Sequence, residues 1–254
     1  MILKNKYKIQ DLIVKGSYSE VFEAKHIIKD TIVAIKFDNG TDISKKLIKH
    51  EMNMYLNLKK NKISNIISIK SYGTIHKTHY LIMEYLPYTL NEMIGTCKEE
   101  VTKTNYFIQC LQRIQMLHNH DILHRDIKPD NFMVSSKGVV HIIDMGLSCM
   151  YGEENKELQN TIGTILFCSF NIHQSKYIYH KQDDIISFYY VIFYILSNGD
   201  LPWNNIHIKD KNVKNKLYYH LKKDTDYNLY YSKYNNKSLN IWIQRYIKYI
   251  YQDV

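Results

Sequence analysis

The sequence predicts a protein of the α+β class, with a small β-rich front part that contains one helix and a larger helical back part. Three observations predict this division. Residues 7–37 are a run of strand-like segments that turn residues separate. The pattern from residue 183 onward is mostly helical, and the change in character follows Tyr85-Leu86-Pro87, which we expect to be a hinge. We therefore expect a single domain over residues 1–254, with one lobe at 1–86 and a second at 87–254.

Strands and one helix account for the front part. Apolar residues at helical spacing predict the helix over Ser44–Leu58, and Ser44 is the expected N-cap. The β-rich composition and the intervening turn residues predict strands at 7–14, 21–26, 31–37, 66–71 and 78–85.

Helices dominate the back part. A helix is expected around residues 101–118, where Phe107, Leu111 and Ile114 share one face. Short strands are expected near 132–134 and 139–143. The longest apolar run, Ile185–Leu196, is shorter than the about 20 residues that a membrane-spanning helix needs, so we expect a helix buried in the core.

The composition is that of a soluble globular protein. Of 254 residues, 45% are hydrophobic and 23% are charged, which excludes a disordered chain. The formal charge of +9 indicates either an anionic partner, such as nucleic acid, or a lysine-rich surface. We favour the explanation that the charge belongs to a lysine-rich surface, because the lysines are spread along the chain and no nucleic-acid-binding motif accompanies them. Nucleic-acid binding is therefore not established.

The N-terminus and the cysteines predict an intracellular location. The first ten residues alternate apolar and charged side chains and lack the apolar core of a signal peptide. The four cysteines form no C-x-x-C pair and no zinc-ligand spacing with histidine. We therefore expect a reduced protein of the cytoplasm, the nucleus or both, and no membrane attachment.

The strongest chemical signal is the polar stretch His124-Arg125-Asp126-Ile127-Lys128-Pro129-Asp130-Asn131. It follows an apolar helix and precedes an apolar strand, which predicts a loop held between core elements. Farther along, Asp144 ends a strand and is followed by Met145-Gly146. These positions place two carboxylates, Asp126 and Asp144, at the ends of core elements.

A second signal lies upstream. Val33-Ala34-Ile35-Lys36 places a lysine at the end of a strand, and Glu51 lies on the apolar face of the following helix. A carboxylate on an apolar face needs a cationic partner, because an unpaired buried charge is costly. Lys36 is the expected partner of Glu51.

The order of these pieces resembles the eukaryotic protein kinases. The resemblance covers about residues 7 to 250 and implies the two-lobed protein-kinase fold. Within that superfamily the chain resembles casein kinase I; the vaccinia-related kinases are a sister group with similar features. The segments that carry this likeness are Ile122–Phe132, Gly163–His173, Asp183–Ser187 and Gly199–Trp203.

The resemblance implies ATP and Mg²⁺ as cofactors, with Mn²⁺ as the alternative cation. Lys36 would contact the α- and β-phosphates and be held by Glu51, while Asp144 and Asn131 would hold the metal. Met83 would stand at the gatekeeper position. The full set implied to bind the nucleotide is Val14, Gly16, Ser17, Val21, Ala34, Lys36, Met83, Glu84, Leu86, Asn131 and Asp144.

The resemblance also implies transfer of the γ-phosphate to serine or threonine hydroxyls of proteins. Asp126 would orient the substrate hydroxyl and accept its proton, and Lys128 would stabilise the transferring phosphoryl group. Thr164 would bridge Asp126 and Lys128, and Asp184 would anchor the catalytic loop. The residues implied to be catalytic are Lys36, Glu51, Asp126, Lys128, Asn131 and Asp144.

One departure from the family keeps an alternative open. The Gly-rich loop reads Val14-Lys15-Gly16-Ser17-Tyr18-Ser19 and retains only Gly16. The alternative is a pseudokinase or nucleotide-binding scaffold whose turnover the altered loop has impaired. A small-molecule phosphotransferase shares the fold, but it lacks a segment like Gly163–His173.

Two further expectations concern the preferred substrate and the source of the protein. Casein kinase I enzymes favour acidic or already phosphorylated proteins, and Lys181 matches one basic position of their pocket. A lysine run, Lys209, Lys211, Lys214 and Lys216, would supply the rest. We expect a constitutively active monomer. The composition suits a kinase encoded by a large DNA virus, in which case it would act in the host cell and the virion, or by an AT-rich parasite.

Overall fold

The computed structural model describes residues 1–254 except 153–157, 159–160, 175, 205 and 226–254. The chain divides into two compact units. The first comprises Met1–Tyr88 and Met133–Ser148, and the second comprises Thr89–Phe132 and Cys149–Val254. The first unit thus includes Met133–Ser148, a segment that follows the expected hinge in the sequence.

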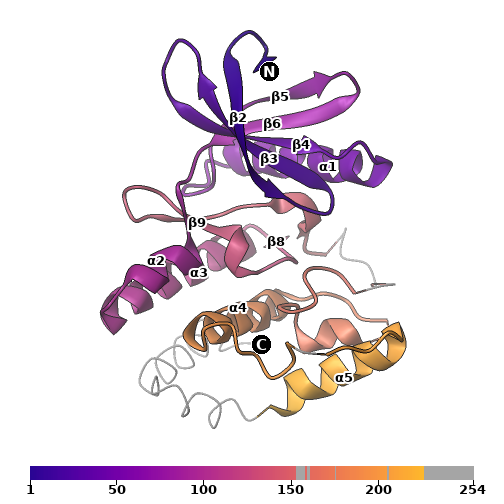
Figure 1. The fold of residues 1–254 in the computed structure, drawn as a ribbon. Coiled ribbons are helices and arrows are strands. Elements are labelled where there is room, and N and C mark those ends of the chain that lie inside the picture. The colour runs from indigo at the N-terminus through magenta and orange to yellow at the C-terminus, as the bar shows by residue number, and fades with distance from the viewer. Residues whose placement is uncertain (153–157, 159–160, 175, 205, 226–254) are drawn as a thin grey trace. The chain divides into compact units, whose positions relative to one another are not determined.

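A six-stranded antiparallel sheet forms most of the first unit, in the order β1-β2-β3-β4-β6-β5 (Figure 1). The strand predictions for residues 7–14, 21–26, 31–37 and 78–85 are confirmed. Buried apolar side chains such as Ala24, Ile35 and Ile82 form the core of the sheet. The strands are β1 (Ile2–Leu3), β2 (Tyr7–Lys15), β3 (Ser19–His26), β4 (Ile32–Asp38), β5 (Ile69–Ile75) and β6 (Thr78–Glu84).

Strand β5 lies later in the sequence than the predicted segment 66–71. Half-buried and exposed residues alternate along Ile69–Ile75, as a strand with one face covered requires. Ile66 instead forms an isolated parallel bridge with Ile142. Glycine is needed at position 73, opposite Tyr80 of β6, because a Cβ atom there would lie 2.5 Å from the Tyr80 hydroxyl oxygen.

Helix α1 (Asp42–Lys60) packs against β4 and β6. Its N-cap is Thr41 and not Ser44, so that prediction was wrong. The Thr41 hydroxyl accepts a hydrogen bond from the Ser44 N–H at 3.2 Å, which makes Ser44 the third helical residue. The face of the helix that carries Ile48, Glu51 and Tyr55 is buried.

Strands β9 (Phe132–Val134) and β10 (Val140–Ile142) pair in a hairpin, which confirms the two predicted short strands. A short 3₁₀ helix, η2 (Met145–Leu147), follows β10 and contacts α1. Asp144 caps η2, so it stands directly between the strand and the 3₁₀ turn.

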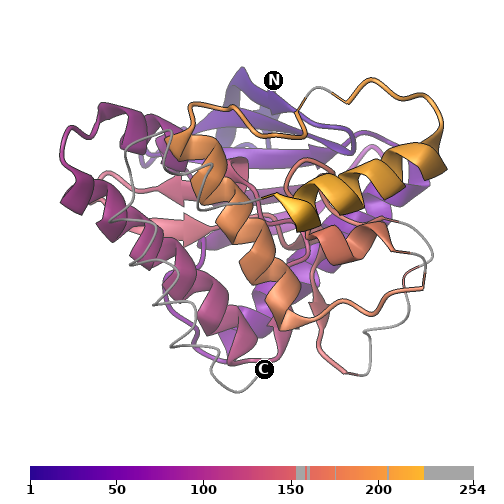
Figure 2. The ribbon, with the colours of Figure 1, turned by 90° about the horizontal axis from the view of Figure 1, so that it is seen from below.

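Helices form the framework of the second unit, and α3 packs against α4 (Figure 2). The helices predicted at 101–118 and 185–196 are confirmed, and the middle of α4 is buried. The helices are α2 (Leu90–Thr96), α3 (Glu100–His118), α4 (Lys181–Leu196) and α5 (Lys211–Asp224), with 3₁₀ turns η1 (Pro129–Asn131) and η3 (Phe170–His173).

Short strands complete the described structure. They are β7 (Tyr88–Thr89), β8 (Ile122–Leu123) and β11 (Cys149–Met150), of which β8 and β11 pair antiparallel. Helix α2 was not predicted, although Thr89 and Glu92 form a capping box with a Thr89 N–H to Glu92 Oε2 distance of 2.8 Å. The helical pattern expected beyond residue 225 lies outside the described residues.

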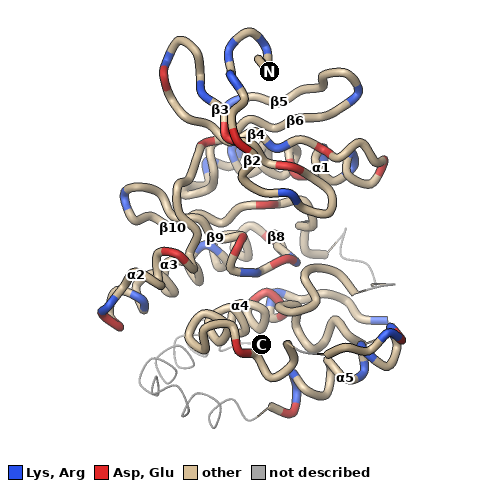
Figure 3. The backbone as a smooth tube through the Cα atoms, in the orientation of Figure 1, with Lys and Arg blue, Asp and Glu red and all other residues tan. Residues whose placement is uncertain are grey.

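Lysine and arginine occur on strands, loops and helices of both units (Figure 3). This distribution agrees with the reading of the +9 charge as a lysine-rich surface. Within the part of the chain that is described, no helix is both long and apolar enough to cross a membrane.

Candidate active site

The first unit brings Lys36, Glu51 and Asp144 together. Strand β4 carries Lys36 and helix α1 carries Glu51, and their Nζ and Oε2 atoms are 2.8 Å apart. The same Nζ lies 3.0 Å from Oδ1 of Asp144. The pairing predicted from the sequence is therefore present, and one ammonium group serves two carboxylates.

Burial and the neighbouring charges together set the pKa values of Lys36 and Glu51. Glu51 is 2% exposed and Lys36 is 9% exposed. Burial raises the pKa of Glu51 to about 7, although the Lys36 charge opposes this change. Burial alone would lower the pKa of Lys36, but the Asp144 and Glu51 carboxylates outweigh it and raise that pKa above its ordinary value. Lys36 stays charged, while Glu51 titrates near neutral pH.

Two contacts fix the backbone at Asp144. Its φ of +63° lies in the left-handed region, which asparagine and aspartate tolerate better than most residues. Its N–H donates to the Tyr55 hydroxyl at 3.0 Å, and its Oδ1 accepts the Gly146 N–H at 3.3 Å. Tyr55 was missed from the sequence because its position on α1 looks like that of any core residue.

The predicted phosphate loop is the turn between β2 and β3. The Gly16 N–H donates to the Ser19 carbonyl at 2.8 Å, and the Asn39 side chain donates to the Ser17 carbonyl at 2.8 Å. Val14 pairs with Val21 across the turn. Hydrogen bonds therefore close this turn although it contains a single glycine.

The predicted adenine-binding residues follow in register on neighbouring strands. Ala34 of β4 pairs with Met83 of β6, and both are buried. Val21 of β3 pairs with Lys36, which places the apolar side chain next to the charged cluster in the sheet. Glu84 ends β6, and Leu86 is 5% exposed just beyond it.

The second unit assembles Asp126, Lys128 and Thr164. The Thr164 N–H and hydroxyl both donate to Oδ1 of Asp126, at 2.8 and 2.7 Å. Lys128 Nζ lies 2.9 Å from Oδ2 of Asp126 and 3.4 Å from the Thr164 hydroxyl oxygen. The bridge that the family resemblance implies is thus present, with one carboxylate oxygen facing threonine and the other facing lysine.

Asn131 lies against the same carboxylate. Its Nδ2 donates to the Asp126 carbonyl at 2.7 Å and contacts Oδ2 at 3.3 Å. The residue is 3% exposed and ends the 3₁₀ turn η1. Because the amide nitrogen is engaged, the side-chain oxygen is the atom that Asn131 can offer to a cation.

Asp184 anchors the loop from α4, as expected. Its Oδ2 accepts a hydrogen bond from the His124 N–H at 2.9 Å and also lies 2.9 Å from Nε2 of His118. Its Oδ1 accepts the Arg125 N–H at 2.9 Å and the Tyr179 hydroxyl at 2.8 Å. Burial alone would raise the pKa of Asp184, but the hydrogen bond and charge of His118 outweigh it and hold that pKa below its usual value.

The role of His118 could not be predicted from the sequence. Its contact with Asp184 spans 66 positions in the chain, so no local pattern could have indicated it. Within the described ranges, no group of three or more histidine, cysteine or acidic side chains could hold a metal on its own.

Gly163 permits the close approach of two loops. Its φ is +82°, and a Cβ atom there would lie 2.5 Å from the Arg125 carbonyl oxygen. Only glycine fits without displacing this backbone. The neighbouring Thr164 can consequently reach Asp126.

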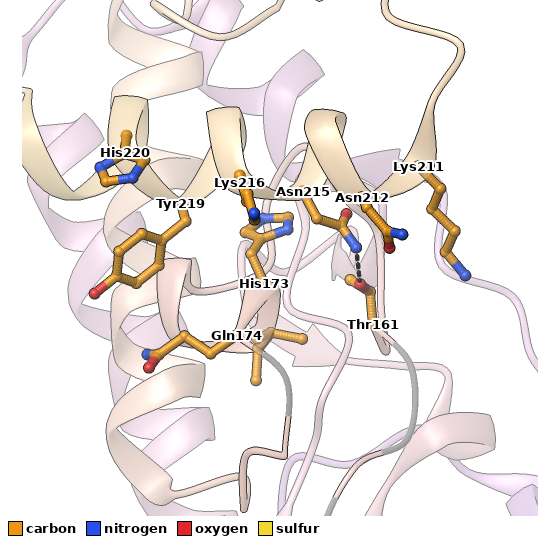
Figure 4. A pocket seen from close by; sticks show the side chains of 10 residues that line it. Thr161, His173, Gln174, Lys211, Asn212, Asn215, Lys216, Tyr219 and His220 are labelled. Atoms are coloured by element: carbon orange, nitrogen blue, oxygen red, sulfur yellow. Dashed lines mark hydrogen bonds between the residues drawn. The ribbon is translucent and has the colours of Figure 1, made fainter.

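The lysines that the family resemblance implies for substrate recognition lie in the second unit. A cavity of about 850 Å³ lies between α5 and the segment that carries His173, and Lys211 and Lys216 line it (Figure 4). Asn215 donates to the Thr161 hydroxyl at 3.4 Å across this cavity. Lys181 is engaged elsewhere, because its Nζ lies 2.8 Å from Oδ1 of Asp121.

Comparison with known proteins assigns the chain to a family, and the matched region includes the residues of both units described above. The family model of the protein kinase domain matches residues 7–249. The chain is 30% identical over 229 residues to the casein kinase I homolog RAG8 of Kluyveromyces lactis, which covers 84% of this chain and 41% of that protein. It is 30% identical over 225 residues to casein kinase I homolog 1 of Saccharomyces cerevisiae, which covers 83% of this chain and 40% of that protein.

The chain thus spans about two fifths of the length of these curated relatives. The matched region contains every residue of the two clusters, from Lys36 to Thr164. Strand order, helix α1 and the helical second unit also agree with the two-lobed fold that the sequence predicts. With a domain model that covers nearly the whole chain, this protein belongs to the protein kinase domain family.

Proposed function

We propose that this chain is a serine/threonine protein kinase of the casein kinase I type, which transfers the γ-phosphate of Mg-ATP to protein hydroxyls. The observation that carries this proposal is the Asp126 carboxylate, which Thr164 holds on one oxygen and Lys128 faces on the other. A lysine two residues after this aspartate is the pattern of serine/threonine kinases. The similarity to casein kinase I homologs supports the same substrate class.

The residues of the first unit suit the nucleotide phosphates. Lys36 is a buried, permanently charged donor, and Glu51 holds it in one orientation. In this role Lys36 neutralises phosphate charge, which is the main requirement of phosphoryl transfer. The backbone contact between Asp144 and Tyr55 fixes where the carboxylate stands.

Each unit carries one side-chain oxygen of a kind that magnesium binds. Asp144 offers a carboxylate and Asn131 offers an amide oxygen, and both are ligands that this hard cation prefers. Nucleotide phosphate oxygens would complete its coordination. When bound, the ion neutralises charge on the phosphates.

The residues of the second unit suit the transfer itself. Asp126 orients the substrate hydroxyl and takes its proton as the new oxygen–phosphorus bond forms. The bond between the γ-phosphorus and the bridging oxygen breaks, and the electron pair leaves with the ADP. Lys128 neutralises charge on the transferring group, and Thr164 keeps the Asp126 carboxylate from rotating.

The pseudokinase alternative is less favoured. An inactive scaffold has no need to retain Asp126, Lys128 and Lys36 in hydrogen-bonded positions. The altered Gly-rich loop also closes with its own hydrogen bonds. We therefore expect the loss of glycines to affect the KM for ATP more than it affects turnover.

We further propose acidic or phosphorylated proteins as preferred substrates. Lys211 and Lys216 line the cavity beside α5 and would supply positive charge to such a substrate (Figure 4). Lysine acts there as a point charge and not as a bidentate fork. Lys181 contributes less than the family pattern implies, because Asp121 neutralises it.

The test is transfer of labelled phosphate from ATP to casein in the presence of Mg²⁺. Wild type should label serine or threonine residues, whereas Lys36→Met and Asp144→Asn should lower the rate by about 10² or more. Wild-type activity no higher than that of both variants, together with a melting temperature that ATP still raises, would establish the pseudokinase instead.

A further inference from the structure

A fully buried lysine lies outside the predicted site. Lys222 on α5 is 0% exposed, and lysine is among the residues least often buried. Its Nζ donates to the Ile165 carbonyl at 2.7 Å and to the Cys168 carbonyl at 2.6 Å. It also lies 3.2 Å from Nε2 of His173. The three donors of the ammonium group are thus matched by three acceptors.

Aromatic rings enclose the same ammonium group. Nζ lies 5.3 Å from the ring centroids of Tyr190 and Tyr218 and 5.7 Å from that of Trp203. Such contacts stabilise a cation that is removed from water. Burial nevertheless lowers the pKa of Lys222 to about 8, and burial lowers the pKa of His173 to about 3. His173, which lies beneath α5 in Figure 4, is therefore neutral and accepts at Nε2.

The two carbonyls belong to the turn 164–168 (Thr164 to Cys168). The N–H groups of Phe167 and Cys168 both donate to the Thr164 carbonyl, at 2.9 and 2.8 Å, so the turn closes on Thr164. Trp203 Nε1 donates to a third carbonyl of this turn, that of Leu166, at 2.9 Å. Side chains from outside the turn therefore bond to three of its carbonyls, and Lys222 bonds to two of these three; within the turn, the Cys168 thiol also contacts the Ile165 carbonyl at 3.5 Å.

Thr164 connects this turn to Asp126. Its N–H and its hydroxyl both bond to one oxygen of the Asp126 carboxylate. A shift of the turn would move both donors together, because they belong to one residue. A displacement of about 1 Å in a reacting group can lower a rate by about 10².

We propose that Lys222 is a positioning residue for the transfer reaction: it fixes the turn 164–168 and, through Thr164, the orientation of the Asp126 carboxylate. This inference rests on the proposed kinase function. Methionine would fill the same space among the rings without donors. The buried cation donates to the Ile165 and Cys168 carbonyls and so keeps these polar groups hydrogen-bonded away from water.

The first test measures the turn without reference to activity. Lys222→Met should speed hydrogen exchange of the amides of residues 164–168 by about tenfold or more. Lys223→Met is the matched control, because Lys223 is the next residue on α5, is exposed and contacts Tyr219 at 3.1 Å. Equal exchange in Lys222→Met and wild type would overturn the proposal.

The second test separates positioning from general stability. In Lys222→Met, kcat per folded molecule should fall about tenfold, while the KM for ATP should change less than about twofold. Lys222→Arg, which keeps a buried cationic donor, should recover part of the loss. A kcat that falls only in proportion to the folded fraction would overturn the proposal.

A double-mutant cycle tests the path through Thr164. If Lys222 acts through that residue, Lys222→Met should lower kcat by a smaller factor in Thr164→Val, which keeps the N–H donor but has lost the hydroxyl donor to Asp126, than in wild type. Losses that multiply would contradict the path. Should Lys222→Met fail to fold, Lys222→Gln takes its place in the cycle, because it keeps an N–H donor without the charge.

The outcomes distinguish this inference from the proposed function. Suppose that the wild type is inactive and that the amides of residues 164–168 exchange faster in Lys222→Met. This result would contradict the kinase function but would support the contact between Lys222 and the turn. An active wild type whose kcat and exchange are unchanged by Lys222→Met would overturn the role of Lys222 alone.

Discussion

The anchor of the catalytic loop gives a prediction that can be worked out atom by atom. Each oxygen of the buried Asp184 carboxylate accepts two hydrogen bonds. Asp184→Asn replaces one oxygen with an NH₂ group, which faces two donors. If Oδ1 is replaced, the Tyr179 hydroxyl can rotate, but the Arg125 N–H loses its acceptor. If Oδ2 is replaced, His118 can change tautomer, but the His124 N–H loses its acceptor.

Either arrangement thus leaves one backbone N–H without its acceptor. An unsatisfied buried donor costs about 1–3 kcal/mol, and loss of the charge weakens the remaining bonds. We expect Asp184→Asn to lower the free energy of unfolding by about 2–4 kcal/mol, a large part of the about 5–15 kcal/mol typical of a folded protein. Urea denaturation monitored by fluorescence measures this change.

The pH dependence supplies a second readout. The pKa of Asp184 is lowered in the folded protein, so its ionised form stabilises the fold above about pH 4, and that stabilisation is lost as the pH falls through the folded-state pKa. The difference in stability between wild type and Asp184→Asn should therefore be largest at neutral pH and shrink in acid. The control is Asp224→Asn, whose side chain is 65% exposed and which should change stability by less than about 0.5 kcal/mol. A destabilisation below that size, or one independent of pH, would refute the reasoning.

Three further predictions concern single contacts. Because the pKa of Glu51 is about 7, its pair with Lys36 strengthens as the pH rises through that value, and we expect Glu51→Gln to remove the corresponding limb from the pH profile of kcat/KM; an unaltered limb would assign it to another group. Tyr55→Phe removes the acceptor of the Asp144 N–H and should lower the unfolding free energy by about 1–2 kcal/mol, measured by thermal denaturation; no loss would mean that water replaces the hydroxyl. Gly163→Ala forces a side chain into the left-handed region against backbone and should lower both stability and kcat, whereas an unchanged melting temperature would contradict the steric argument.

Much of the first unit could be predicted from the sequence, because its signals are local. The β-rich composition and the intervening turn residues located β2, β3, β4 and β6, and the apolar face of α1 located Glu51 and its need for a cation. The misplaced helix cap has a local cause as well. Thr41 and Ser44 are both residue types that cap helices and lie three positions apart, and only the structure shows which one lies outside the helix.

The contacts that hold the candidate site were harder to predict. Asp126, Lys128, Asn131 and Asp144 were found because their motifs are short and specific. Lys222 was not, because its acceptors are carbonyls 54 and 57 positions earlier in the chain, and any side chain can stand beside a carbonyl. Such contacts depend on the tertiary structure and leave no pattern in neighbouring residues.

In the proposed function, Asp126 serves phosphoryl transfer to a protein hydroxyl. The most direct measurement compares kcat for casein phosphorylation between wild type, Asp126→Asn and the neighbouring exposed control Asp130→Asn. We expect Asp126→Asn to lower kcat by about 10²–10⁴ at an unchanged KM for ATP, and Asp130→Asn to remain within about twofold of wild type. Equal kcat values for wild type and Asp126→Asn would contradict the account.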